Sequence, residues 1–208
     1  DSLGLPDNNI TDIYRDSHNR LWVATVNGVC LYQTNGNFKR VSINSANKNI
    51  EKILEDKEGR IFFFTMTDLY QYDEKTNRAI TRLSKMVEKN CYNYSCHIDR
   101  KDVMWIVTSY SVKGYRTQDL KLIAQSPVQS YPIASFLLDG HQLYISGYNG
   151  MQLFDTDTRK WQQLPAALQG LQIPNDMVSG IHPYGEKGNL LLSTTKHGLL
   201  YFNAQEGT

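Results

Sequence analysis

Tyrosine and asparagine gather in the polar segments of this 208-residue chain, which contains 13 Tyr. An aromatic face can stack on the C–H surface of a sugar ring, and a side-chain amide can bond two neighbouring hydroxyl groups. A lysine or histidine beside them can meet an acidic group. The alternative is that these residues only cap loops. The candidate binding residues of this kind are Asn27, Tyr92, Tyr110, Tyr131, Tyr148, Asn149, Lys196 and His197.

A second set of chemistry-bearing residues is a row of aspartates, which recurs at intervals of about 40 residues. Each stands just before a polar turn, where a carboxylate commonly accepts backbone N–H groups. We therefore interpret the row as turn residues and not as catalytic acids or bases. Its members are Asp16, Asp56, Asp99 and Asp139.

Enzymatic and metal-binding motifs are absent from the sequence. It contains no nucleophile elbow, phosphate loop, HExxH or EF-hand pattern, and its five His residues fall at unrelated places. We predict no catalytic residue, no metal and no cofactor. The three cysteines, Cys30, Cys91 and Cys96, form no CxxC pair. Cys91 and Cys96 could form a disulfide, and the alternative is that all three are free thiols.

Charge and hydropathy exclude several other functions. The 22 Lys+Arg nearly balance the 21 Asp+Glu, so strong attraction to nucleic acid or to an anionic membrane is not expected. No run approaches the roughly 18 apolar residues of a membrane span. The first residues are polar and do not resemble a signal peptide, so an exported parent protein would have lost its targeting segment.

The elements that must position these residues follow from an internal repeat. Ile10, Ile13 and Asp16 precede the run Leu21–Thr25, and the same order of apolar, turn and apolar residues returns four more times. Short runs rich in β-branched and aromatic residues, bounded by Gly, Asn and Asp, predict strands. A period of about 40 residues with four strands is typical of a β-propeller blade, and a β-sandwich is the alternative.

The first repeat predicts strands A to D, and the remaining repeats extend the pattern through a single β-propeller region, 1–208. The predicted strands are Ile10–Arg15, Leu21–Thr25, Val29–Gln33 and Phe38–Ile43, with Asn35-Gly36 as a two-residue hairpin turn. Trp22 and Trp105 share a strand B position, which predicts that they pack between blades. The approximate blades are 1–44, 45–88, 89–128, 129–168 and 169–208.

The fold class predicted is therefore all-β, with five blades of which the last lacks its outer strand D after Phe202. We expect these repeats to be part of a larger propeller array. The unpaired edges of such an open stack could allow a homodimer. In a propeller the B–C and D–A loops share one face, and this face carries the candidate binding residues.

Residues 3–32 resemble the two-component regulator propeller repeat. The resemblance rests on Gly4-Leu5-Pro6, Asn8, Ile10, Ile13, Asp16, Leu21-Trp22, Thr25, Asn27-Gly28 and Tyr32, and the later repeats follow it more loosely. Such repeats are typical of the periplasmic sensor regions of bacterial hybrid two-component receptors, many of which sense products of polysaccharide breakdown.

The resemblance implies a non-catalytic periplasmic sensor module that binds an oligosaccharide and passes the signal on by repacking of propellers or domains. Its partners would be the ligand and the neighbouring blades or domains of the same receptor, with no nucleic acid and no membrane contact in this region. The alternative is a structural propeller for protein–protein assembly. A propeller lyase or hydrolase is the third hypothesis.

Overall fold

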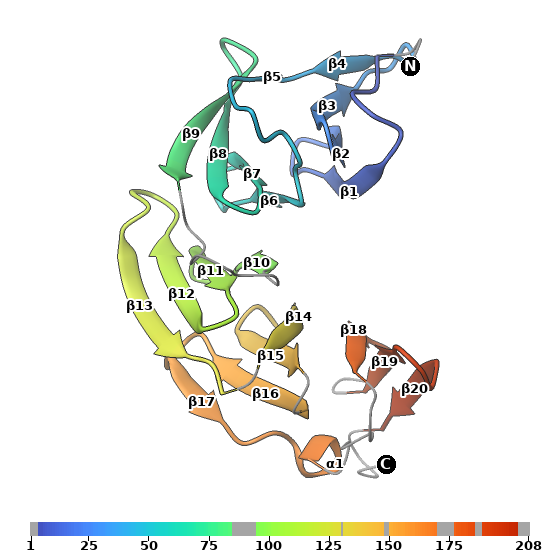
Figure 1. The fold of residues 1–208 in the computed structure, drawn as a ribbon, viewed down its shortest axis with the longest axis vertical. Helices are drawn as coiled ribbons and strands as arrows, with labels where there is room; N and C mark the ends of the chain where they lie inside the picture. Colours follow the sequence, from blue (N-terminus) through green and yellow to red (C-terminus); the bar gives the residue numbers. More distant parts are fainter. Residues whose placement is uncertain are drawn as a thin grey trace. The chain divides into compact units, whose positions relative to one another are not determined.

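The computed structural model describes residues 4–84, 95–129, 131–147, 150–169, 177–185 and 189–203. The chain is all-β apart from the single turn of helix α1 (Ala166–Gln169) found in the described residues, and its sheets are propeller blades, as predicted (Figure 1). The chain divides into two compact units, residues 1–89 and residues 90–208. Within those described ranges, no helix is long and apolar enough to cross a membrane.

The first unit holds two blades, each built on four antiparallel strands in sequential order. The strands of blade 1 are β1 (Ile10–Arg15), β2 (Leu21–Thr25), β3 (Gly28–Tyr32) and β4 (Phe38–Arg40). The strands of blade 2 are β6 (Lys52–Glu55), β7 (Ile61–Phe64), β8 (Asp68–Asp73) and β9 (Arg78–Ser84), with the short β5 (Ser42–Ile43) added outside β9. The bounds of β1 and β2 are the predicted ones.

The second unit holds blades 3 to 5. Blade 3 consists of β10 (Ser95–Ile98), β11 (Val103–Val107), β12 (Ser111–Arg116) and β13 (Leu122–Pro127). Blade 4 consists of β14 (Pro132–Leu138), β15 (Gln142–Gly147), β16 (Gly150–Asp155) and β17 (Lys160–Gln162). Blade 5 has three strands in the described residues, as predicted: β18 (Val178–Pro183), β19 (Leu190–Thr194) and β20 (Leu199–Phe202).

The predicted strand D of blade 1 was wrong at its end. The chain leaves the sheet at Val41, and β5 crosses to pair in parallel with β9 of blade 2 (Figure 1). Burial explains the crossing, because Val41 and Ile43 enter the hydrophobic cluster between blades 1 and 2. Asn77 holds the crossing chain, since its carbonyl accepts from the Ser42 amide at 3.1 Å.

The predicted two-residue turn at Asn35-Gly36 was also wrong. Tyr32 pairs with Phe38, and the Gln33 amide donates to the Asn37 carbonyl at 2.8 Å, so the loop is longer than two residues. Gly36 has a φ of 85°. The glycine therefore serves a wider loop in which one residue takes the left-handed conformation.

Packing between neighbouring blades centres on the predicted tryptophans. Trp22 is fully buried and contacts the rings of Phe63 and Tyr72 in blade 2 at 5.7 and 4.9 Å between centroids. Trp105 is equally buried and contacts Phe154 of blade 4 at 5.3 Å. The prediction that both tryptophans pack between blades is confirmed, and neither offers a surface to a ligand.

All four aspartates of the row were predicted to stabilise the A–B turns, and three of them do so. In blade 1, Asp16 Oδ1 accepts from the amides of His18 and Arg20 at 3.0 and 2.8 Å. Its Oδ2 accepts from Trp22 Nε1 at 2.8 Å. Asp56 and Asp99 repeat the amide pattern. The fourth departs from it, because Asp139 is exposed, has a φ of 49° and presents its carbonyl oxygen to His141 Nδ1.

Candidate ligand-binding site

The turns between strands B and C are held by one threonine at the end of strand B. In blade 3 the Thr108 hydroxyl donates to the Ser111 carbonyl at 3.2 Å and accepts from the amides of Tyr110 and Ser111. A hydroxyl can do both because it carries one donor and two lone pairs. The sequence interpretation missed this role, although the residue recurs at the repeat spacing. The threonines are Thr25, Thr65, Thr108 and Thr194.

Backbone hydrogen bonds tie these turns to the segments that connect successive blades. The Val26 amide donates to the Asn9 carbonyl at 3.1 Å, and the Val128 amide donates to the Tyr110 carbonyl at 3.1 Å. In blade 5 the Thr195 amide donates to the Met177 carbonyl at 3.0 Å. The prediction that B–C and D–A loops lie together is thus confirmed for these three pairs.

Two of the predicted binding residues come together in the second unit. The rings of Tyr110 and Tyr131 meet edge to face, with centroids 6.4 Å apart and planes at 63°. Their exposed fractions are 46% and 57%, so both rings are available to solvent. Edge-to-face geometry leaves one aromatic face open beside the edge of the other ring. This pair can stack on the apolar face of a sugar ring while its hydroxyl groups bond to the ligand.

The loop that carries Tyr131 is fixed on both sides. On one side the Val128 amide is bonded to the Tyr110 carbonyl, as above, and the Gln129 amide donates to Gln152 Oε1 at 3.0 Å. On the other side Pro132 is buried at the start of β14. Ligand binding to the tyrosine pair would therefore order few additional groups, which keeps the entropic cost of binding low.

The remaining predicted residues are distributed over both units. Lys196 and His197 are exposed in the turn between β19 and β20, where the His197 amide donates to Thr194 Oγ1 at 2.9 Å. Asn27 is exposed in the first unit, in the turn between β2 and β3. Tyr92, Tyr148 and Asn149 lie outside the described residues.

Asn27 borders a small cleft that the sequence interpretation did not identify. The cleft has a volume of about 220 Å³ and is lined by Pro6, Asn27, Gly28, Val29, Arg40, Val41, Ser42, Ile43 and Lys48. Arg40 is anchored there, because its Nε and Nη2 donate to the carbonyls of Gly4 and Leu5 at 2.7 and 2.8 Å. Lys48 adds an exposed ammonium group, so the cleft presents two cations beside an amide.

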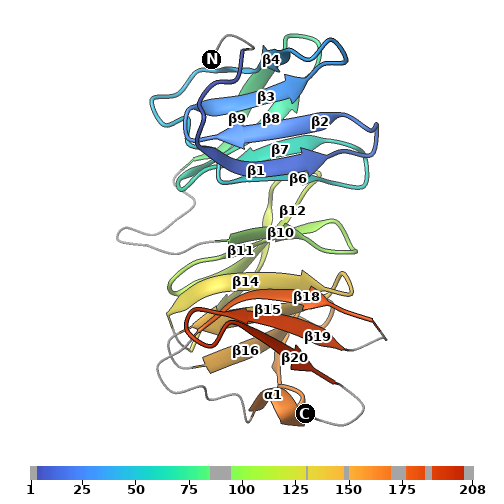
Figure 2. The ribbon, with the colours of Figure 1, turned by 90° about the vertical axis from the view of Figure 1, so that its right-hand side faces the viewer.

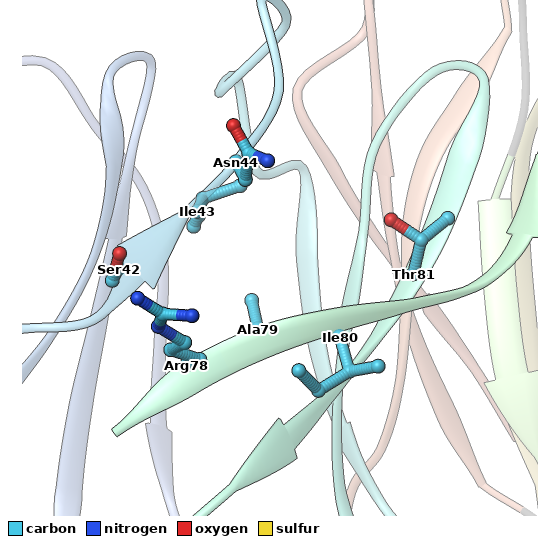
Figure 3. A pocket seen from close by; sticks show the side chains of 7 residues that line it. All are labelled: Ser42, Ile43, Asn44, Arg78, Ala79, Ile80 and Thr81. Atoms are coloured by element: carbon cyan, nitrogen blue, oxygen red, sulfur yellow. The ribbon is translucent and has the colours of Figure 1, made fainter. Parts of the chain in front are cut away.

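A larger groove of about 540 Å³ lies where β5 meets β9 (Figure 3). Ser42, Ile43 and Asn44 line one side of it, and Arg78, Ala79, Ile80 and Thr81 line the other. The groove exists because the chain crosses from blade 1 to the outer edge of blade 2. This crossing depends on packing between blades, so no local sequence signal predicts the groove.

Carboxylates in the first unit serve to join the blades. Glu55 of blade 2 accepts from the Ser17 amide at 2.9 Å and from the Tyr14 hydroxyl at 3.1 Å, both in blade 1. Burial and the nearby Glu55 raise the pKa of Tyr14 to about 12, so this hydroxyl stays protonated as a donor.

In the ranges that the structure describes, no group of three or more His, Cys, Asp or Glu residues could hold a metal ion.

The structure describes two of the three cysteines, Cys30 and Cys96. Cys30 is a free, fully buried thiol whose Sγ lies 3.6 Å from the Val23 carbonyl, and burial raises its pKa to about 11. Cys96 is also buried, in β10. Cys91 lies outside the described residues, so the predicted alternative of a bond between Cys91 and Cys96 stays a prediction.

Comparison with known proteins finds a family match in the first repeat. Residues 4–27 match the family model for the two component regulator propeller. Those residues include the Gly4-Leu5-Pro6 opening, the first aspartate of the row and Trp22. No curated protein matches the sequence.

Solved structures share the fold at low sequence identity. The extracellular domain of a putative hybrid two component system of B. thetaiotaomicron is 18% identical, with a TM-score of 0.69, and the match covers 100% of this chain and 30% of that one. A second such domain from the same organism is 14% identical, with a TM-score of 0.58 and coverage of 96% and 34%. The chain thus spans about a third of these domains.

Enzymes share the fold as well. Virginiamycin B lyase from Staphylococcus aureus is 12% identical, with a TM-score of 0.66, and the match covers 95% of this chain and 70% of the lyase. At such identities the likeness shows the propeller fold alone.

Proposed function

We propose that this chain is part of the extracytoplasmic sensor region of a hybrid two-component receptor, because residues 4–27 match the family model for the two component regulator propeller. The family match is the observation that carries the proposal. The likeness to two extracellular receptor domains supports it. In this account the location is the periplasm, and the histidine kinase that produces the output lies elsewhere in the receptor.

The ligand that we propose is an oligosaccharide released from a polysaccharide. The exposed pair of Tyr110 and Tyr131 supports this ligand class, because two rings held edge to face suit the apolar face of a sugar. Asn27, with Arg40 and Lys48 in its cleft, offers donors for hydroxyl or carboxylate groups in the first unit. Binding would shift the packing of blades or domains and so bias the receptor between two states.

Calorimetric titration of the complete extracytoplasmic region with a panel of glycan oligosaccharides tests the ligand class. We expect saturable binding of at least one member of the panel. A panel without any binder would contradict it. The same mixtures, analysed by chromatography, test the non-catalytic assignment, which predicts that every glycan is recovered unchanged. This second readout matters because lyases share the fold.

A structural propeller that serves protein–protein assembly is the second candidate. The observation in its favour is the exposed apolar surface of β20, where Leu199 and Tyr201 are 64% and 51% exposed. Titration separates the two candidates, since an assembly module has no need to bind a small sugar.

A further inference from the structure

Arg40 departs from the pattern that the blades repeat. The strands of blade 1 lie side by side in the order β1 to β4, so Arg40 ends the outer strand, where it pairs with Cys30 (Figure 2). Counted by strand pairing from the threonine that ends strand B, the corresponding residue is Thr81 in blade 2 and Gln125 in blade 3. Packing between blades recurs at the repeat spacing, whereas a ligand site need not. Blades 2 and 3 pack without a charge at this position, so packing does not require the arginine.

The guanidinium group of Arg40 is held in place by the backbone. Its Nε donates to the Gly4 carbonyl at 2.7 Å and its Nη2 donates to the Leu5 carbonyl at 2.8 Å. The segment with these carbonyls packs closely on β4, because a Cβ atom on Gly4 would lie 2.7 Å from the Phe38 carbonyl oxygen. Among the described residues, the N–H groups of Nη1 have no acceptor. They are therefore positioned to donate to a ligand.

Lys48 brings a second cation to the same cleft. It lies in the loop from β5 to β6, where the Asn49 amide donates to Asn47 Oδ1 at 3.1 Å and the Ile50 amide donates to the Thr25 carbonyl at 3.2 Å. The Lys48 side chain is exposed and forms no ion pair within the described ranges. No carboxylate from those ranges lines the cleft. This part of the chain therefore leaves the positive charge of the cleft unneutralised.

Apolar residues form the floor of the cleft. Val29, Val41 and Ile43 line it, and all three are buried in the cluster between blades 1 and 2. The exposed amide of Asn27 lies at its border. A sugar ring matches such a surface, because its C–H groups pack on apolar side chains and its hydroxyls bond to an amide. The volume of about 220 Å³ limits the occupant to a group about the size of one sugar residue.

We propose that this cleft binds the acidic group of a charged sugar residue, a carboxylate or a sulfate. Arg40 and Lys48 donate to the oxyanion, while Asn27 bonds to a ring hydroxyl. Charge-assisted hydrogen bonds from a fixed guanidinium are stronger than those between neutral groups, so the charge decides which sugar is bound. That the anion is carried on a sugar rests on the proposed function. The site is separate from the pair of Tyr110 and Tyr131, which belongs to the second unit.

An NMR titration of the full chain tests the cleft with sugars that share one ring. The probes are the methyl glycosides of glucuronic acid, of glucose 6-sulfate and of glucose. We expect saturable shifts of the Gly28 and Ser42 amides with one or both acidic probes, and affinity weaker by about tenfold for the neutral probe. The acidic probe that binds more tightly distinguishes carboxylate from sulfate. Equal affinity for the neutral probe, or shifts confined to residues outside the cleft, would overturn the proposal.

Removal of either cation should weaken binding of the acidic probe. Lys48→Gln removes an exposed charge and should lower affinity by about twofold to fivefold. Arg40→Gln should lower it by about tenfold. Because Arg40→Gln also releases the carbonyls of Gly4 and Leu5, Lys48→Gln keeps the test independent of that segment. The matched control, Lys39→Gln, removes a charge from the opposite face of β4 and should bind as wild type. An equal loss in the control would indicate general charge attraction and contradict a site.

Failure of the cleft proposal can be told apart from failure of the sensor proposal. If an acidic probe binds the cleft but no glycan of the panel binds the complete extracytoplasmic region, the sensor proposal fails and the anion site stands. If a glycan of the panel binds but neither acidic probe shifts the amides of Gly28 and Ser42, the cleft proposal alone fails.

Discussion

Trp22 donates its indole N–H to Asp16 Oδ2 at 2.8 Å, and both side chains are buried where blade 1 meets blade 2. Trp105 repeats the bond to Asp99 at 2.7 Å in blade 3. One carboxylate thus shapes the A–B turn and orients the ring that packs on the following blade. This bond links the turn residue of the repeat to its packing residue, and it explains why the two recur together in these blades.

Replacement of Asp16 by Asn should lower stability in a pH-dependent way. Burial alone would raise the pKa of Asp16, but hydrogen bonds from Trp22 and Arg20 outweigh it, so the pKa lies below its ordinary value. A carboxylate with a lowered pKa stabilises the fold above its unfolded value, about pH 4, and this contribution is lost as pH falls through the folded value.

Chemical unfolding of wild type and Asp16→Asn at pH 7 and pH 3 measures this effect. The variant should be less stable at pH 7 by about 1–3 kcal/mol, because buried donors lose a charged acceptor, and the difference should shrink towards pH 3. The control, Asp139→Asn, alters an exposed member of the row and should behave as wild type. A difference for Asp16→Asn that does not change with pH would refute the assigned role.

Removal of the tryptophan ring should cost far more than removal of its hydrogen bond. Trp22→Ala empties a fully buried site between the blades and should lower the free energy of unfolding by about 3–5 kcal/mol. Trp22→Phe keeps an aromatic ring against Phe63 and Tyr72 and should cost clearly less. Urea denaturation of the two variants compares these costs. Similar losses would show that the bond to Asp16, and not the packing, dominates.

Gly114 has a specific role beside Trp105. The two residues pair across β11 and β12, and a Cβ atom on Gly114 would lie 2.9 Å from ring atoms of Trp105. Gly114→Ala should therefore destabilise the protein by about 1–3 kcal/mol through overpacking. In a double-mutant cycle, Trp105→Phe should relieve part of this cost because the clashing ring atoms are removed. Additive losses in the double variant would exclude the contact as the cause.

The sequence predicts the blades well because the same residue pattern recurs in each repeat. A departure from the pattern in one repeat therefore does not hide it. Trp22 and Trp105 could be assigned to packing since a position that recurs in each blade has the same environment in each. Asp16, Asp56 and Asp99 could be assigned to turns for the same reason. Asp139 shows the limit of this argument, because the A–B turn of its own blade takes another conformation.

Contacts between blades that do not recur at the repeat spacing escape prediction. β5 reads as the end of a strand in blade 1, yet burial of Val41 and Ile43 carries it to β9. The groove beside it and the cleft at Asn27 follow from that crossing. The pairing of Tyr110 with Tyr131 depends on how the Val128 and Gln129 amides anchor a loop of another blade. Composition indicates such tyrosines as candidates but does not show which of them meet.

The central claim is that the Tyr110 and Tyr131 pair binds a glycan in a sensor region. Its most direct measurement is titration of a bound oligosaccharide into the wild-type region and into Tyr110→Ala and Tyr131→Ala. Loss of one stacking ring, at about 0.5–1.5 kcal/mol, predicts affinity weaker by roughly twofold to tenfold for each variant. The matched control, Tyr184→Ala, removes a ring that is also 57% exposed but lies outside this pair, and it should bind as wild type. Unchanged affinity in both pair variants would contradict the account.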